Sequence, residues 1–83
     1  MGYRAKIEIS LKPGHADPEG EATKRSLRDM KYEVEEVRTI KVYDVSLKVK
    51  SLEEAEKQVE EMCLRLLANP VKDNYSYKIA EEN

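Results

Sequence analysis

Residues 66–71, Leu-Leu-Ala-Asn-Pro-Val, mark the point where a helix ends and the chain continues as a strand. Before this point the apolar residues recur at the three- and four-residue spacing of one buried helical face, at Leu52, Ala55, Val59, Met62, Cys63, Leu66 and Leu67. Pro70 cannot donate a helical hydrogen bond, and it biases Asn69 away from helical backbone angles. The pattern predicts a helix over 52–68, a strand over 71–79 and a frayed tail over 80–83, with Asn69 and Pro70 as an architectural junction.

The elements before this helix are marked by alternation and by capping residues. Apolar and polar side chains alternate over residues 3–12, which is typical of a strand with one buried face. Asp17 and Pro18 predict the start of a helix over 18–30, because a carboxylate caps free backbone donors and proline suits the first helical position. Gly20 in the first turn costs about 1 kcal/mol of helix propensity relative to alanine, so we expect a packing reason for it.

The segment 34–50 is rich in β-branched residues, and its alternation changes phase between Thr39 and Asp44. A tight hairpin usually needs a glycine-containing turn, and the segment has no glycine. We therefore favour one long, bent strand, with a two-strand hairpin as the alternative. A strand of roughly 16 residues is about three times the usual length, so part of it needs a partner, naturally a second copy of the chain. Val45 and Leu47 are predicted to lie on the buried surface of that dimer.

Length and composition limit the class of protein. The 83 residues predict a single domain, 1–83, with a thin core, since 39% of them are charged and none is Trp or Phe. A net charge of −2 lacks the basic footprint of a nucleic-acid-binding protein. The charged, alternating start does not resemble a signal peptide, and no run approaches the ~20 apolar residues of a membrane span. We expect a cytoplasmic protein that binds neither nucleic acid nor membranes.

The chain offers little reactive chemistry. His15 is the only histidine and Cys63 the only cysteine, so no metal-ligand set can be assembled around either. Cys63 lies on the apolar helix face and is expected to be a small buried hydrophobe. We predict no catalytic residue, no cofactor-binding residue and no metal ligand. Arg38, inside the valine-rich segment, is either an interface residue paired with a carboxylate or a solvated strand-face residue.

Several short motifs together resemble the PurS family, the small subunit of phosphoribosylformylglycinamidine synthase. They are Leu-Lys-Pro-Gly at 11–14, Asp-Pro-Glu-Gly at 17–20, Val-Arg at 37–38 and the stretch 62–71. The chain departs from the usual family pattern at His15-Ala16, at Lys31, where glycine often ends the first helix, and at Thr39-Ile40. These departures leave the exact turn geometry open.

The resemblance implies an α+β fold, a two-layer β-α-β-(β)-α-β module related to the ferredoxin-like fold, with a long bent middle strand and a sheet completed by dimerisation. It also implies a homodimer, or a tetramer, that joins a glutaminase subunit to a larger synthetase subunit. That ligase uses ATP and Mg to convert formylglycinamide ribonucleotide to the amidine in purine biosynthesis, with ammonia passed between subunits. This chain would bind no cofactor and carry no catalytic residue.

Other classes of function remain as alternatives. A ferredoxin-like module can bind a small metabolite as a regulatory domain at a dimer interface. An RNA-binding module would need exposed aromatic side chains with basic neighbours, whereas Tyr75 and Tyr77 share their predicted strand face with Ile79 and no positive cluster. An independent small enzyme is disfavoured, because no nucleophile and base are paired.

Overall fold

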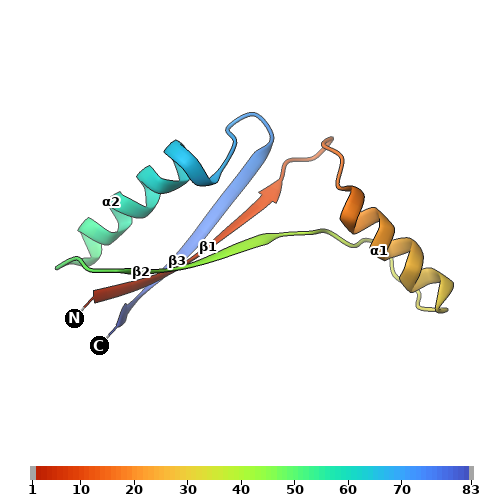
Figure 1. Ribbon diagram of the computed structural model, residues 1–83, viewed down its shortest axis with the longest axis horizontal. Coiled ribbons are helices and arrows are strands. Elements are labelled where there is room, and N and C mark those ends of the chain that lie inside the picture. The colour runs from red at the N-terminus through yellow and green to blue at the C-terminus, as the bar shows by residue number, and fades with distance from the viewer. Residues whose placement is uncertain (1, 83) are drawn as a thin grey trace.

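The computed structural model describes residues 2–82 as a three-stranded sheet with two helices. The elements follow the order β1 (Gly2–Leu11), α1 (Pro18–Asp29), β2 (Lys41–Leu47), α2 (Leu52–Met62), a π-helical turn (Cys63–Leu67) and β3 (Asp73–Glu82). All strand pairs are antiparallel, in the order β2-β1-β3. Helix α2 lies along one face of the sheet, whereas α1 stands away from it at the far end of β2 (Figure 1).

The core lies between α2 and one face of the sheet. Alternation along β1 buries Ala5, Ile7 and Ile9, as the sequence predicts. Each of these is flanked on both sides by residues of the same face, so that Ala5 pairs with Val45 of β2 and with Ile79 of β3. Helix α2 and its π-helical end contribute Ala55, Val59 and Cys63, and the other buried core residues are Leu47, Val49 and Ala68. The sheet face that points away from α2 carries the polar residues of the alternation.

The predicted helix 52–68 changes form at Cys63. Its last turn is π-helical, with the Ala68 N–H donating to the Cys63 carbonyl at 3.0 Å. A π turn takes more residues than an α turn, so the positions after Cys63 rotate away from the face that a 3.6-residue period predicts. Leu66, expected in the core, is therefore 82% exposed, while Ala68 is buried.

The junction after this turn is held by polar contacts of Asn69. Its side-chain oxygen accepts from the Val71 N–H at 2.9 Å, and its own N–H donates to the Asp73 carboxylate at 2.8 Å. The Lys12 ammonium donates to the Pro70 carbonyl at 3.0 Å, which fastens the junction to the end of β1. Strand β3 begins at Asp73 and runs to Glu82, so the predicted fraying of 80–82 is wrong, because these residues pair with β1. Asn83 lies outside the described residues.

The prediction of one long strand over 34–50 is wrong, because the structure forms no such strand within a single chain. Only Lys41–Leu47 pairs with β1, beginning opposite Ile9. Residues 33–40 leave the sheet toward α1 as a direct continuation of β2 (Figure 1), and the hairpin alternative does not form either. Among residues 2–82, no backbone hydrogen bond joins 33–40 to another backbone group. The segment is extended, but it has no strand beside it.

The end of α1 is closed by Lys31. The predicted helix 18–30 is confirmed to within one residue, with Met30 as its cap. Lys31 has a φ of 75°, its N–H donates to the Arg28 carbonyl at 2.9 Å, and the Tyr32 N–H donates to the Leu27 carbonyl at 3.1 Å. This pair of bonds is the Schellman ending, which usually places glycine at the left-handed residue.

Candidate functional site

Asp17 and Gly20 join the start of α1 to the segment that leads into β2. The Asp17 carboxylate accepts from the Gly20 N–H at 3.1 Å, as the predicted cap, and from the Thr39 N–H at 2.8 Å. The bond from Thr39, followed by the bond from Gly20, lowers the pKa of Asp17 below its ordinary value. Pro18 occupies the first helical position, as predicted. Asp17 therefore holds the start of α1 and the segment before β2 together.

Gly20 is required by this close approach. It is the buried residue of α1, and a Cβ atom there would lie 2.6 Å from the Val37 carbonyl oxygen and 2.5 Å from the Asp17 carboxylate. Both distances are shorter than real Cβ contacts allow. The predicted packing reason for Gly20 is confirmed.

Arg38 lies on the same segment and contacts its own chain. Its guanidinium donates to the Leu11 carbonyl at 3.3 Å and lies 3.8 Å from the Glu36 carboxylate. Its side chain is 49% exposed. Arg38 therefore ties the segment after α1 to the end of β1, and half of its surface remains available to a partner.

Val45 and Leu47 lie on the α2-facing side of β2. Leu47 is buried in the core, whereas Val45 is half-buried at the edge of the area that α2 covers. Asn69 and Pro70 lie far along the chain, at the junction that precedes β3. The sequence-predicted residues thus form three groups, one at the base of α1, one on β2 and one at the junction.

A carboxylate and two tyrosines fix α2 to β3. The Tyr77 hydroxyl donates to one Glu60 oxygen at 2.7 Å, and the Tyr75 hydroxyl donates to the other. These bonds lower the pKa of Glu60 and raise that of Tyr77 to about 12. Both aromatic side chains therefore lie under α2 with their hydroxyls engaged, which disagrees with a base-stacking surface for RNA.

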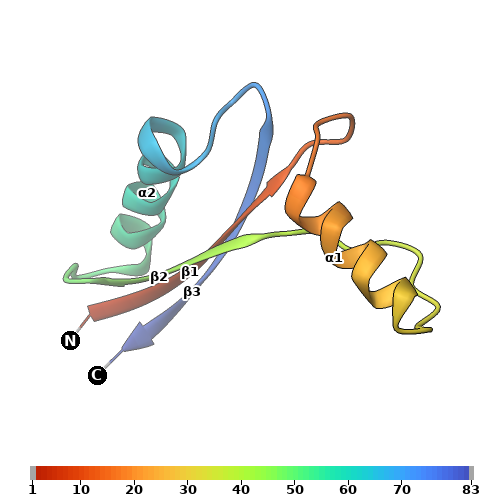
Figure 2. The same cartoon turned by 45° about the vertical axis from the view of Figure 1, so that its right-hand side comes forward.

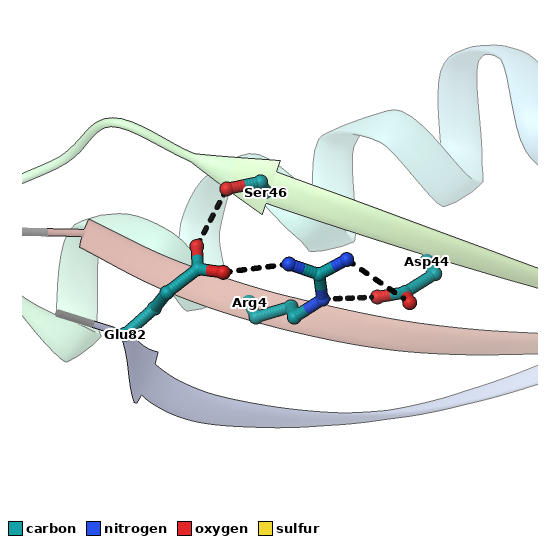
Figure 3. Close-up of polar contacts among 4 residues, drawn as sticks. All are labelled: Arg4, Asp44, Ser46 and Glu82. Carbon is teal, nitrogen blue, oxygen red and sulfur yellow. Dashed lines mark hydrogen bonds and ion pairs between the residues drawn. The ribbon is translucent and has the colours of Figure 1, made fainter.

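The polar sheet face carries a network that sequence reasoning missed. Arg4 of β1 donates to Asp44 of β2 at 2.8 Å and to Glu82 at the end of β3 at 2.6 Å (Figure 3). The Ser46 hydroxyl donates to the second Glu82 oxygen at 2.6 Å. Arg4 lowers the pKa of Asp44, and Ser46 followed by Arg4 lowers that of Glu82. Alternation along each strand predicts that these side chains share one face of the sheet. It does not predict the register between the strands, which brings the side chains into contact.

Among residues 2–82, the remaining titratable groups show no reactive arrangement. Cys63 is buried, as predicted, and burial raises the pKa of its thiol, which is the reverse of an activated nucleophile. Within residues 2–82, no three His, Cys, Asp or Glu side chains are grouped to hold a metal ion. In the same range, no helix is long and apolar enough to cross a membrane.

Comparison with known proteins gives consistent matches along the chain. The family model described as PurS, phosphoribosylformylglycinamidine (FGAM) synthase, matches residues 4–81. A PurS subunit from Archaeoglobus fulgidus is 49% identical over 73 residues, which cover 87% of this chain and 91% of that protein.

Two solved structures show the same fold. PurS from Methanocaldococcus jannaschii, described as a subunit of formylglycinamide ribonucleotide amidotransferase in the purine biosynthetic pathway, has a TM-score of 0.85 at 38% identity. It covers 98% of this chain and 99% of its own. A chain in the PurLQS structure from Thermotoga maritima has a TM-score of 0.88 at 27% identity, over 96% of this chain and 99% of that one.

Proposed function

This chain belongs to the PurS family of phosphoribosylformylglycinamidine synthase subunits, and from that premise we propose that it assembles the enzyme without taking part in its chemistry. The synthase is a glutamine-dependent ligase of purine biosynthesis. In the proposal, a cytoplasmic homodimer of this single-domain chain joins the glutaminase subunit to the larger synthetase subunit. Ammonia released from glutamine then reaches the synthetase, where ATP and Mg are used. This chain itself would bind neither ATP nor Mg.

The observation that carries the proposal is how the ionisable side chains are used. Those with displaced pKa values hold elements of the fold together: Asp17 joins α1 to the segment before β2, Glu60 joins α2 to β3, and Arg4 joins all three strands. The thiol of Cys63 is buried with a raised pKa. In active sites, groups with perturbed pKa values are usually free to react with a ligand. In this chain those groups are engaged in contacts that hold the fold together.

The partners are inferred from a neighbour of known composition. The Thermotoga maritima chain with the same fold is part of a structure described as PurLQS, a complex of three kinds of subunit. The match covers 96% of this chain at a TM-score of 0.88. This similarity supports the same kind of assembly here.

Reconstitution tests the proposal. Glutaminase and synthetase subunits are combined with and without this chain, and product formation is followed with glutamine or with ammonium as the nitrogen source. Omission should abolish the glutamine-dependent reaction and largely spare the ammonia-dependent one, because only ammonia delivery depends on assembly. The equal loss of both reactions would contradict the proposal.

A matched variant separates assembly from chemistry. His15 is the only histidine and is exposed, so His15→Ala leaves the core intact. The variant complex should assemble and turn over normally. A complex that assembles but turns over about a thousandfold more slowly, which corresponds to ~4 kcal/mol of barrier, would identify His15 as a chemical participant and overturn the proposal.

A further inference from the structure

A cleft lies where the end of β1, the start of α1 and the segment before β2 meet. Figure 2 shows these three parts of the chain together at the end of the sheet farthest from the two termini. The cleft has a volume of 570 Å³. Three of the motifs that resemble the PurS family, at 11–14, 17–20 and 37–38, contribute to its walls, and β3 adds Asn74. Segments that are distant in the sequence thus form one concave surface.

The two strongest cations of the cleft, Lys12 and Arg38, bind backbone carbonyls. The Lys12 ammonium donates to the Pro70 carbonyl at 3.0 Å, and the Arg38 guanidinium donates to the Leu11 carbonyl at 3.3 Å. An ammonium has three N–H donors and a guanidinium has five. Within residues 2–82, neither side chain makes another hydrogen bond. Most of their donors are therefore available to a partner.

The carboxylates of the cleft leave these cations largely uncompensated. Both oxygens of Asp17 already accept from backbone N–H groups. Glu36 lies 3.8 Å from the Arg38 guanidinium and its side chain is 74% exposed, and an exposed pair of this kind contributes little. Among residues 2–82, no carboxylate forms an ion pair with Lys12. A carboxylate from outside the chain would find both cations free to bind it.

The lining of the cleft favours a protein segment over a small molecule. Small-molecule sites are lined mostly by apolar and aromatic side chains. Most residues that line this cleft are polar or charged, and none of them is aromatic. Arginine is enriched in protein interfaces, where its planar guanidinium binds a carboxylate through two parallel hydrogen bonds. An Asp or Glu side chain of another protein therefore fits the available donors.

We propose that this cleft receives an acidic segment of another subunit of the synthase, with an Asp or Glu carboxylate bound to Arg38 and with Lys12 beside it. The inference rests on the proposed function, because the partner is one of the subunits that this chain would assemble. Asp17 holds the wall that carries Arg38 against the start of α1. The cleft is therefore formed before the partner arrives, which lowers the cost of binding.

Binding of Arg38 variants to the other subunits tests the proposal. The affinity of this chain for the glutaminase and synthetase subunits is measured at low and high salt, with glutamine, ATP and Mg present. Arg38→Gln should weaken binding about tenfold and reduce its salt dependence, because charged contacts supply both affinity and steering. Arg38→Lys keeps the charge without the paired donors and should give an intermediate affinity. The matched control is Arg25→Gln, which removes an exposed arginine of α1 outside the cleft.

Carbodiimide coupling tests the same contact directly, since it joins a lysine amine to a carboxylate that lies against it. In the assembled complex, Lys12 should be joined to an Asp or Glu of another subunit, as identified by mass spectrometry of the digested product. Lys12→Arg keeps the charge and cannot couple, so this product should disappear. Coupling at Lys57, which is exposed on α2 outside the cleft, should stay unchanged.

The outcomes separate failure of the cleft from failure of assembly. If Arg38→Gln binds as tightly as Arg25→Gln, or if the complex gives no Lys12 cross-link to another subunit, the cleft is not the docking site and the proposed assembly still stands. If sedimentation shows that Arg38→Gln converts a dimer to a monomer, the cleft belongs to a contact between copies and the proposal is overturned. A parent chain that binds neither subunit overturns the proposed function as well. Thermal melting verifies that each variant is folded, and if Arg38→Gln is not, the Lys12 cross-link decides.

Discussion

Replacing Lys31 with glycine should stabilise the protein, and the structure fixes the sign of the effect. Lys31 adopts a φ of 75° at the end of α1, in the left-handed region. For a residue with a side chain that conformation costs roughly 1–2 kcal/mol, and glycine removes the cost. Glycine also adds freedom to the unfolded chain, worth about 0.4–1 kcal/mol against folding. The difference predicts a gain of about 0.5–1 kcal/mol in the free energy of unfolding, or about 3–6 °C in melting temperature.

The matched control is Lys31→Ala, which removes the charge and keeps the Cβ atom. Thermal melting followed by circular dichroism at one fixed protein concentration compares the three proteins, since the stability of any oligomer, including the proposed homodimer, depends on concentration. Lys31→Ala should melt close to the parent, because alanine is as strained as lysine at positive φ. If Lys31→Gly melts no higher than Lys31→Ala, the reasoning from backbone strain at this position is wrong.

Three further substitutions test the packing and the polar networks. Gly20→Ala should lower the melting temperature despite its gain in helix propensity, because the added Cβ meets the Val37 carbonyl at 2.6 Å; the exposed control Ser26→Ala should not. Arg4→Gln should weaken the loss of stability in acid, because Arg4 keeps the pKa of the Asp44 and Glu82 carboxyls below their ordinary values of 3.8 and 4.5. Their contribution to stability is therefore present above the ordinary values and lost as the pH falls through the lowered ones, and urea titrations at several pH values measure this loss. Tyr77→Phe should reduce the loss of stability as the pH rises above 10. The pKa of Tyr77 is raised to about 12, so its hydroxyl contributes fully to stability below pH 10, and this contribution is lost between pH 10 and 12. A variant whose pH profile matches that of the parent would contradict the corresponding network.

The positions of most elements follow from local patterns in the sequence. Alternation identified β1, and the Asp17-Pro18 pair identified the start of α1. At the start of α2 the Ser51 hydroxyl accepts from the Glu54 N–H at 3.1 Å, which is an ordinary helix N-cap contact. Each of these signals is complete within a few residues, because capping and alternation depend on neighbours along the chain. Gly20 was predictable as a packing residue for the same reason, although its contact with Val37 was not.

The features that the sequence analysis placed wrongly or did not predict depend on geometry that a local pattern of residues does not contain. Strand β2 begins at Lys41, opposite Ile9, although β1 itself continues to Leu11, so composition alone extended the strand too far. Leu66 was placed in the core by a 3.6-residue period that the π turn at Cys63 interrupts. The Arg4 network needs the register of three strands at once, which periodicity along any one strand does not contain.

The contacts at both ends of α1 fasten the helix to the segment that returns to β2. Asp17 binds both Gly20, at the start of the helix, and Thr39, at the end of the returning segment. At the other end, the Arg28 guanidinium donates to the Val34 carbonyl at 3.1 Å. The helix and the segment are thus fastened together at both ends before any partner is present. A partner that docks on this unit would therefore meet a preformed surface, with little ordering of the chain left to oppose association.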